Sequence, residues 1–166
     1  MEMNESELRL CNDTLALLIK KFDMVAAVIV SSQDGLHVAS KSQDAGMEMD
    51  AIAAMSASLL SLADALAGQA GKPMVDNVIS EAESSTLVIL HAGELILTVI
   101  GQTGINIGLI LSSARTAAKE IGTMTETVTE DVKSIEVRGL TMLQNPELLL
   151  ERIKKEMKEK NSGNNK

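Results

Sequence analysis

The side chains that most often carry out chemistry are scarce in this chain of 166 residues. It has two histidines, His37 and His91, and one cysteine, Cys11, all far apart in the sequence. Both histidines fall in predicted strands and outside any recognisable nucleophile motif, and the three residues lack the spacing of a zinc site. We therefore predict no catalytic residue and no bound metal.

Two glycine-containing stretches invite comparison with phosphate-binding loops. The run LAGQAGKP at residues 66–73 shares Gly71-Lys72 with such a loop, but it follows a helix and places Pro73 where Mg²⁺ needs a hydroxyl. A second group lies between a predicted strand and a predicted helix without the spacing of a dinucleotide fingerprint: Gly101, Gly104 and Gly108. We read both as turns and expect no cofactor.

The composition narrows the range of partners. Phe22 is the one aromatic residue, which disfavours pockets for flat cofactors, bases or sugars. The net charge is −8, and residues 42–114 hold eight acids against one base, Lys72. This excess disfavours nucleic acid and anionic membranes as partners. It fits either a partner with a basic surface or a simple need for solubility.

The sequence also predicts where the protein acts. One cysteine cannot form an internal disulfide, and the polar, acidic start of the chain does not resemble a signal peptide. No uncharged apolar run reaches the roughly 18 residues of a membrane span. We expect a cytoplasmic protein without a membrane span.

Hydrophobic periodicity predicts eight elements in the order helix, two strands, helix, three strands, helix. Three short connections make the strand pairs antiparallel. The first, fourth and fifth strands are apolar on both faces and belong at the centre of a covered sheet. The expected fold is thus α+β with strand order 2-1-5-4-3, one long helix on one face and two helices on the other. The predicted ranges are 5–22, 25–31, 36–40, 47–69, 75–81, 86–92, 95–100 and 106–121.

The long helix predicted at residues 47–69 carries two stripes at 3-4 spacing and only two charges, Asp50 and Asp64. One stripe is bulky and the other contains only small side chains. This pattern predicts a helix that is packed on two sides. The bulky stripe is Ile52, Met55, Leu59, Leu62 and Leu66, and the small stripe is Ala51, Ala54, Ser58, Ser61 and Ala65.

Three stretches in this order resemble the Roadblock domain, the dynein light-chain Roadblock-type fold: VAAVIVSSQDGLHVAS, LVILHAGELILTVI and INIGLILSSARTAAKEI. The resemblance covers about residues 5–122 and points to the prokaryotic type that regulates small GTPases. It implies the same layered (profilin-like) arrangement, and a dimer with an identical copy or a related Roadblock subunit. It also implies a small Ras-like GTPase as a partner, docked on the paired long helices.

The resemblance implies an interface for this chain. The bulky stripe would face the sheet, and the small stripe would face the sister helix or the partner. The third strand would pair with its copy through Val75, Asn77, Ile79 and Glu81.

Residues after 122 extend beyond a minimal Roadblock domain. We predict a linker or a further strand for residues 123–144 and a disordered tail for residues 161–166. Residues 145–160 predict an amphipathic helix with Leu149, Ile153 and Met157 on one side. This helix could dock a partner, pack on its own domain or remain solvated.

Three functions follow as hypotheses. The leading one is a dimeric, non-catalytic module that regulates or scaffolds a small GTPase. The alternatives are an adaptor that builds assemblies without affecting a GTPase, and a small-molecule sensor of PAS-like or GAF-like shape. The absence of tryptophan and tyrosine disfavours the sensor, because such domains need an enclosed pocket.

Overall fold

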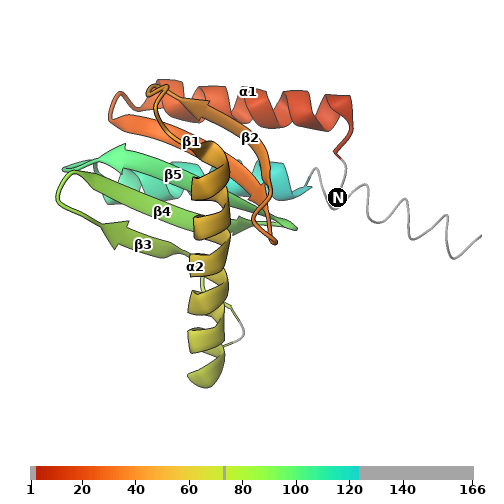
Figure 1. The fold of residues 1–166 in the computed structure, drawn as a ribbon, viewed down its shortest axis with the longest axis vertical. Coiled ribbons are helices and arrows are strands. Elements are labelled where there is room, and N and C mark those ends of the chain that lie inside the picture. Colours follow the sequence, from red (N-terminus) through yellow and green to blue (C-terminus); the bar gives the residue numbers. More distant parts are fainter. Residues whose placement is uncertain (1–2, 73, 124–166) are drawn as a thin grey trace, which may run out of the picture. The chain divides into compact units, whose positions relative to one another are not determined.

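The computed structural model describes residues 3–72 and 74–123, and all of them belong to the first of two compact units, Met1–Glu126 and Thr127–Lys166 (Figure 1). A last helix begins at residue 107 and continues to residue 123, where the described part of the chain ends. The other elements are α1 (Glu5–Lys21), β1 (Val25–Ser32), β2 (His37–Ser42), α2 (Met49–Gln69), β3 (Val78–Glu81), β4 (Ser85–Ala92) and β5 (Leu95–Gln102).

The five strands form one sheet in the order β2-β1-β5-β4-β3, with every neighbouring pair antiparallel. The predicted order and fold class are therefore confirmed. The edge strand β3 is shorter than predicted, because pairing with β4 begins only at Val78, opposite Ile89. Val75 and Asn77, predicted as part of this strand, lie in the segment that leads into it.

Local sequence signals explain where the elements begin and turn. Asn4 and Glu7 form a reciprocal capping box at the start of α1. Gly35 adopts a φ of +85° in the turn between β1 and β2, a conformation that glycine adopts without strain. Asn106 accepts a hydrogen bond from the Leu109 N–H and caps the last helix, which was predicted to begin at residue 106. The predicted end of this helix at residue 121 is wrong, because the helix continues through residue 123.

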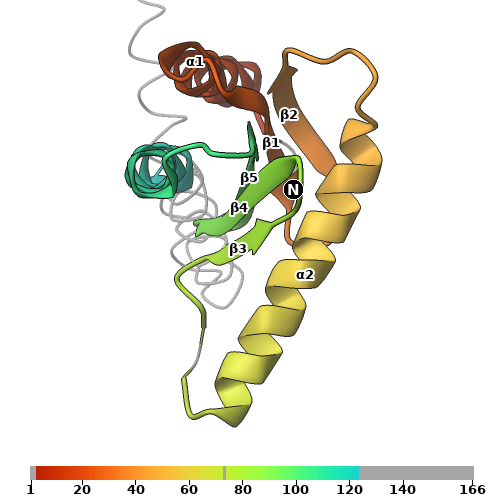
Figure 2. The same cartoon turned by 90° about the vertical axis from the view of Figure 1, so that its left-hand side faces the viewer.

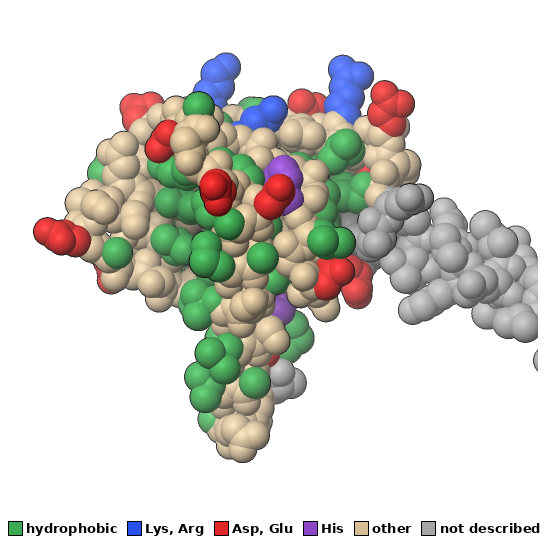
Figure 3. Space-filling view, viewed as in Figure 1, with side chains coloured by type: hydrophobic (Ala, Val, Ile, Leu, Met, Phe, Trp, Pro, Cys, Tyr) green, Lys and Arg blue, Asp and Glu red, His purple; other side chains and the backbone are tan. Residues whose placement is uncertain are grey.

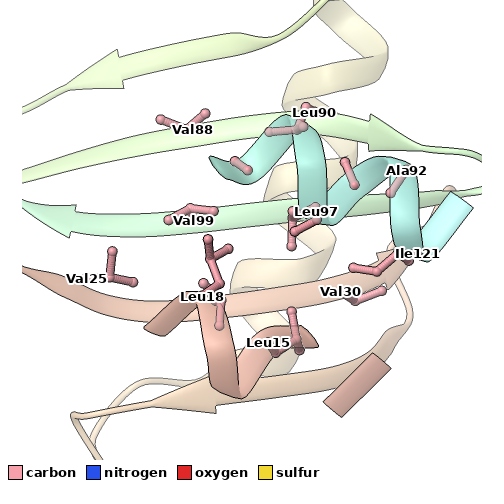
Figure 4. Packing of buried hydrophobic residues seen from close by; sticks show 14 of the residues in the cluster. Leu15, Leu18, Val25, Val30, Val88, Leu90, Ala92, Leu97, Val99 and Ile121 are labelled. Carbon is pink, nitrogen blue, oxygen red and sulfur yellow. The ribbon is translucent and has the colours of Figure 1, made fainter. Parts of the chain in front are cut away.

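The helices cover opposite faces of the sheet, as predicted (Figure 2). On one face, α1 and the last helix enclose a continuous core that includes Leu15, Val28, Leu97 and Ile121 (Figure 4). On the other face, α2 crosses the sheet alone. Its contacts with the strands form two small clusters, one around Ile29 and Ala53 and one around Leu60, Ile89 and Ile96.

The orientation of α2 corrects one prediction. The bulky stripe was expected to face the sheet, but only Ile52 packs partly against it. The other four members are exposed, and a third stripe lies on the sheet instead: Ala53, Ser56, Ala57 and Leu60. Small side chains let the α2 backbone lie close to the strands. This close approach is visible at Gly35, where an added Cβ would lie 2.9 Å from the Ala54 Cα.

Candidate protein interaction surface

The outward side of α2 carries several large hydrophobic side chains that are exposed to solvent. Successive residues of a helix are rotated by about 100°, so the three stripes of α2 each occupy about a third of its circumference. One third packs on the sheet, and the other two face solvent. Figure 3 shows hydrophobic side chains along the exposed length of this helix.

The large apolar side chains that are exposed on α2 all belong to the bulky stripe. The exposed fractions are 63% for Met55, 38% for Leu59, 59% for Leu62 and 64% for Leu66. Burying a leucine side chain contributes about 1.5–3 kcal/mol relative to leaving it in water. Several large apolar residues in a row on one helix therefore indicate an interaction surface.

The small stripe lies beside it. All five predicted members are exposed: Ala51, Ala54, Ser58, Ser61 and Ala65. The Ser58 hydroxyl donates a hydrogen bond to the Ala54 carbonyl at 2.9 Å, so its polar group lies along the helix and does not project from it. The two stripes together form a ridge of large side chains next to a groove of small ones.

The two charges of α2 are both directed at histidines of the sheet. Asp64 Oδ2 lies 3.0 Å from His91 Nε2 on β4, and Asp64 Oδ1 accepts the Val75 N–H at 2.8 Å. The His91 contact is an ion-pair distance without hydrogen-bond alignment. Asp50, at the other end of the helix, lies 3.5 Å from His37 Nδ1 on β2. Both histidines of the chain thus lie beside an aspartate of α2, and the Asp64–His91 contact is the shorter and the more buried.

The free edge of β3 is the second predicted interface. Ile79 is 41% exposed and Glu81 is exposed, whereas Val75 and Asn77 are half-buried. Among the described strands, β3 pairs with β4 alone. An unpaired edge presents backbone N–H and C=O groups to which another strand can add.

No arrangement for catalysis emerges from these residues. Across residues 3–72 and 74–123 no three His, Cys, Asp or Glu side chains gather as metal ligands would. Cys11 is fully buried in the core, and this burial raises its thiol pKa from 9.0 to about 11. A thiol held protonated in this way is a poor nucleophile.

By length and composition alone, α2 could span a membrane, with a mean hydropathy of 1.5 over its most apolar window. The expectation of no span considered only uncharged runs, and this helix reaches its hydropathy despite containing Asp50 and Asp64. Only 22% of that window is buried within the subunit. Its apolar character therefore reflects surface that the subunit itself does not cover.

The predicted docking residues Leu149, Ile153 and Met157 lie outside the described residues. The third stripe of α2 was missed by the sequence analysis, although it was visible in principle. Ala53, Ala57 and Leu60 have the same 3-4 spacing as the other two stripes. What concealed it was the assumption that the largest side chains face the core.

Comparison with known proteins places this fold. The family described as "mitogen-activated protein kinase kinase 1 interacting" matches residues 11–132, well over half of the chain. The chain belongs to this family. Two relatives from Methanocaldococcus jannaschii, named uncharacterized proteins MJ1340 and MJ0310, are each 27% identical over 112 residues. These matches cover 68% of this chain and 97% of each relative.

Solved structures confirm the resemblance to Roadblock domains at the level of the fold. MglB of Myxococcus xanthus superposes with a TM-score of 0.70 at 21% identity, covering 76% of this chain and 96% of that one. The gliding protein MglB of Thermus thermophilus has a TM-score of 0.70 at 16% sequence identity, and the match covers 75% of this chain and 95% of that one. A Roadblock/LC7 domain from Streptomyces avermitilis has a TM-score of 0.62 at 20% sequence identity, and the match covers 66% of this chain and 92% of that one. The family member described here therefore has the Roadblock/LC7 fold.

Proposed function

We propose that this protein is a dimeric, non-catalytic module that binds a small Ras-like GTPase and regulates it or holds it in an assembly. The observation that carries the proposal is the exposed apolar side of α2, on a fold shared with MglB and Roadblock/LC7 domains. A family described by an interaction with a kinase is consistent with a binding module. The GTPase as partner follows from the Roadblock resemblance.

The dimer rests on the shape of the two outward stripes of α2. A two-fold axis places the same surface of each copy against the other, so the surface must complement itself. A ridge of Met55, Leu59 and Leu62 beside a groove of Ala54 and Ser58 meets this condition. In an antiparallel pair, the ridge of each helix lies in the groove of the other. The interface therefore includes the bulky stripe, which the sequence analysis had assigned to the subunit core.

The edge of β3 extends this interface. Pairing of β3 with its copy through Ile79 and Glu81 would join two sheets and cover an aggregation-prone edge. A related Roadblock subunit with a similar helix and edge could replace the identical copy.

Insertion of α2 into a membrane is disfavoured by its own charges. A spanning α2 would remove Asp64 from His91 and from the Val75 N–H, and it would place both aspartates in hydrocarbon. The cost of a charged side chain at the bilayer centre is at least about 2.5–3.5 kcal/mol each. Pairing with a second protein helix covers the same apolar residues and keeps both contacts.

The test uses the full chain with Ras-like GTPases encoded by the same genome. We expect one of these GTPases to bind the protein in a pull-down. Binding should either change the rate of nucleotide turnover by the GTPase or keep the GTPase in a complex with the protein. Leu62→Glu should abolish binding or dimerisation while the subunit stays folded, because this side chain is 59% exposed. Leu17→Glu, on the 69%-exposed outer side of α1, is the matched control.

Two outcomes would count against the proposal. If no GTPase of that genome binds, the adaptor function without a GTPase is favoured. If Leu17→Glu and Leu62→Glu have equal effects, the binding surface is not on α2.

A further inference from the structure

A surface pocket of about 370 Å³ lies between the last helix and the turn that joins β4 to β5. It is separate from the outward side of α2, and its lining comes from three parts of the chain. Arg115 and Lys119 come from the last helix, His91 and Gly93 from the end of β4 and its turn, and Asp76 from the segment before β3. This volume is within the range of small-molecule sites.

The walls of the pocket are set by close backbone packing. An added Cβ at Gly122 would lie 2.9 Å from the Gly93 nitrogen, so the last helix meets the β4–β5 turn directly. β3 pairs with β4 only as far as Ile89, so the end of β4 beyond it is left without a neighbouring strand on that side. The hollow is therefore a consequence of the short β3 and the close helix–turn contact.

The charge of the pocket differs from that of the rest of the domain. Residues 3–72 and 74–123 contain fourteen acids and seven bases, whereas the pocket has two bases, Arg115 and Lys119, and one acid, Asp76. Neither basic side chain forms an ion pair or hydrogen bond with another described residue. They are four residues apart on one helix, an arrangement in which like charges repel each other. Both side chains are therefore available to an anion.

We propose that this pocket binds a small oxyanion, a phosphate or carboxylate group of a soluble molecule. The Arg115 guanidinium supplies a planar fork that fits either group in a bidentate manner, and Lys119 supplies a second positive charge. His91 contributes a wall of the pocket, with both of its ring nitrogens shielded from solvent and Nε2 turned toward Asp64. Asp76 opposes binding of an anion and restricts where the anion can sit.

The experiment is a titration of the isotope-labelled full chain, followed by NMR at constant ionic strength. Inorganic phosphate and succinate are the two probes, and chloride is the reference anion. We expect saturable shifts of the Gly93 and Gly122 amides with one or both probes and none with chloride. The probe that saturates at the lower concentration distinguishes a phosphate site from a carboxylate site.

Paired variants separate the pocket from general electrostatics. The double variant Arg115→Ala with Lys119→Ala should weaken binding by about tenfold or more, equal to about 1.4 kcal/mol. Lys20→Ala with Lys41→Ala removes the same charge from exposed positions outside the pocket and should leave the affinity within about twofold, because salt screens distant charges. Asp76→Asn should tighten binding, whereas Glu81→Gln, with the same change in net charge, should not.

Three results would overturn the proposal. The first is the absence of a saturable shift with either probe. The second is an equal response to chloride, which indicates general ion binding. The third is an equal loss of affinity in the two double variants, the one within the pocket (Arg115→Ala with Lys119→Ala) and the one outside it (Lys20→Ala with Lys41→Ala). Since Arg115 and Lys119 are exposed, the amide spectrum of their variant should show an unchanged fold.

Discussion

The two faces of the sheet are built in opposite ways. On the face covered by α1 and the last helix, large side chains such as Leu15, Leu97 and Ile121 point inward and form one continuous core. On the α2 face, three of the four buried residues of the helix are small, with Leu60 as the exception, and the large residues Met55, Leu59, Leu62 and Leu66 are exposed. The first face is completed by the chain itself. The second leaves Met55 and Leu62 exposed, and this difference is the reason for proposing α2 as an interface.

The largest expected effect tests this contrast in side-chain truncation. Leu97→Ala removes a fully buried side chain from the α1 face and should lower the free energy of unfolding by about 3 kcal/mol. Leu62→Ala, the same change on the outward side of α2, should lower that of the isolated subunit by less than about 0.5 kcal/mol. Urea denaturation at high dilution measures both, since association adds stability at higher concentration. Equal losses would remove the contrast between the faces.

The next effect concerns how closely α2 approaches the sheet. Gly35→Ala adds a Cβ that meets the Ala54 backbone, at a φ of +85° that alanine adopts only under strain. We expect a loss of about 1–3 kcal/mol in thermal or urea unfolding. Gly68→Ala is the control, because an added Cβ at this helical position has no neighbour within 4 Å. It should be neutral or stabilise by up to about 1 kcal/mol, and a comparable loss there would contradict the account.

A smaller effect separates the two histidine contacts of α2. Asp64→Asn weakens the contact with His91 and the bond from the Val75 N–H, and should cost about 1–2 kcal/mol. Asp50→Asn should cost less than about 0.5 kcal/mol, because the Asp50 side chain is 93% exposed at 3.5 Å from His37. Urea unfolding of both variants gives the comparison. If the costs are reversed, the N-terminal half of α2 is the better anchored part.

The smallest effect is a pH dependence of stability that arises from Cys11, in the core between the sheet and α1. Burial raises the pKa of Cys11 from 9.0 to about 11, so the unfolded chain loses this proton first as the pH rises. Stability from this group is thus present below pH 9 and falls between pH 9 and about 11. The expected loss is about 1 kcal/mol by pH 10. Cys11→Ala should show a shallower alkaline decline in urea unfolding, and an identical decline in both proteins would exclude Cys11 as its source.

Most of the fold could be predicted because its signals are local. Alternating and continuous apolar runs located the five strands, and their polarity gave the sheet order that is observed. The Asp34-Gly35 turn and the Asn106 cap are fixed by the chemistry of these side chains. The start of β3 was misplaced, because its pairing with β4 and not the local sequence determines where the strand begins, and the last helix continues past the predicted end at residue 121.

The orientation of α2 could not be predicted in the same way. Periodicity shows that stripes exist, but three stripes with equal spacing leave open which one faces the sheet. The assumption that large residues face inward failed at Leu59, and it would imply that a charge at this position unfolds the subunit. With 38% of this side chain exposed, a charge there should instead disturb association. The small stripe was correctly expected on the outside, and its partner stays a prediction.

We propose that a second α2 covers the outward side of this helix. The most direct measurement is the molar mass of the purified full chain by light scattering coupled to size exclusion, with Leu62→Glu run beside it. Such a pair of helices requires twice the mass of the 166-residue chain for the natural protein and a folded monomer for the variant. A monomeric natural protein, or a variant that remains a dimer, would contradict it.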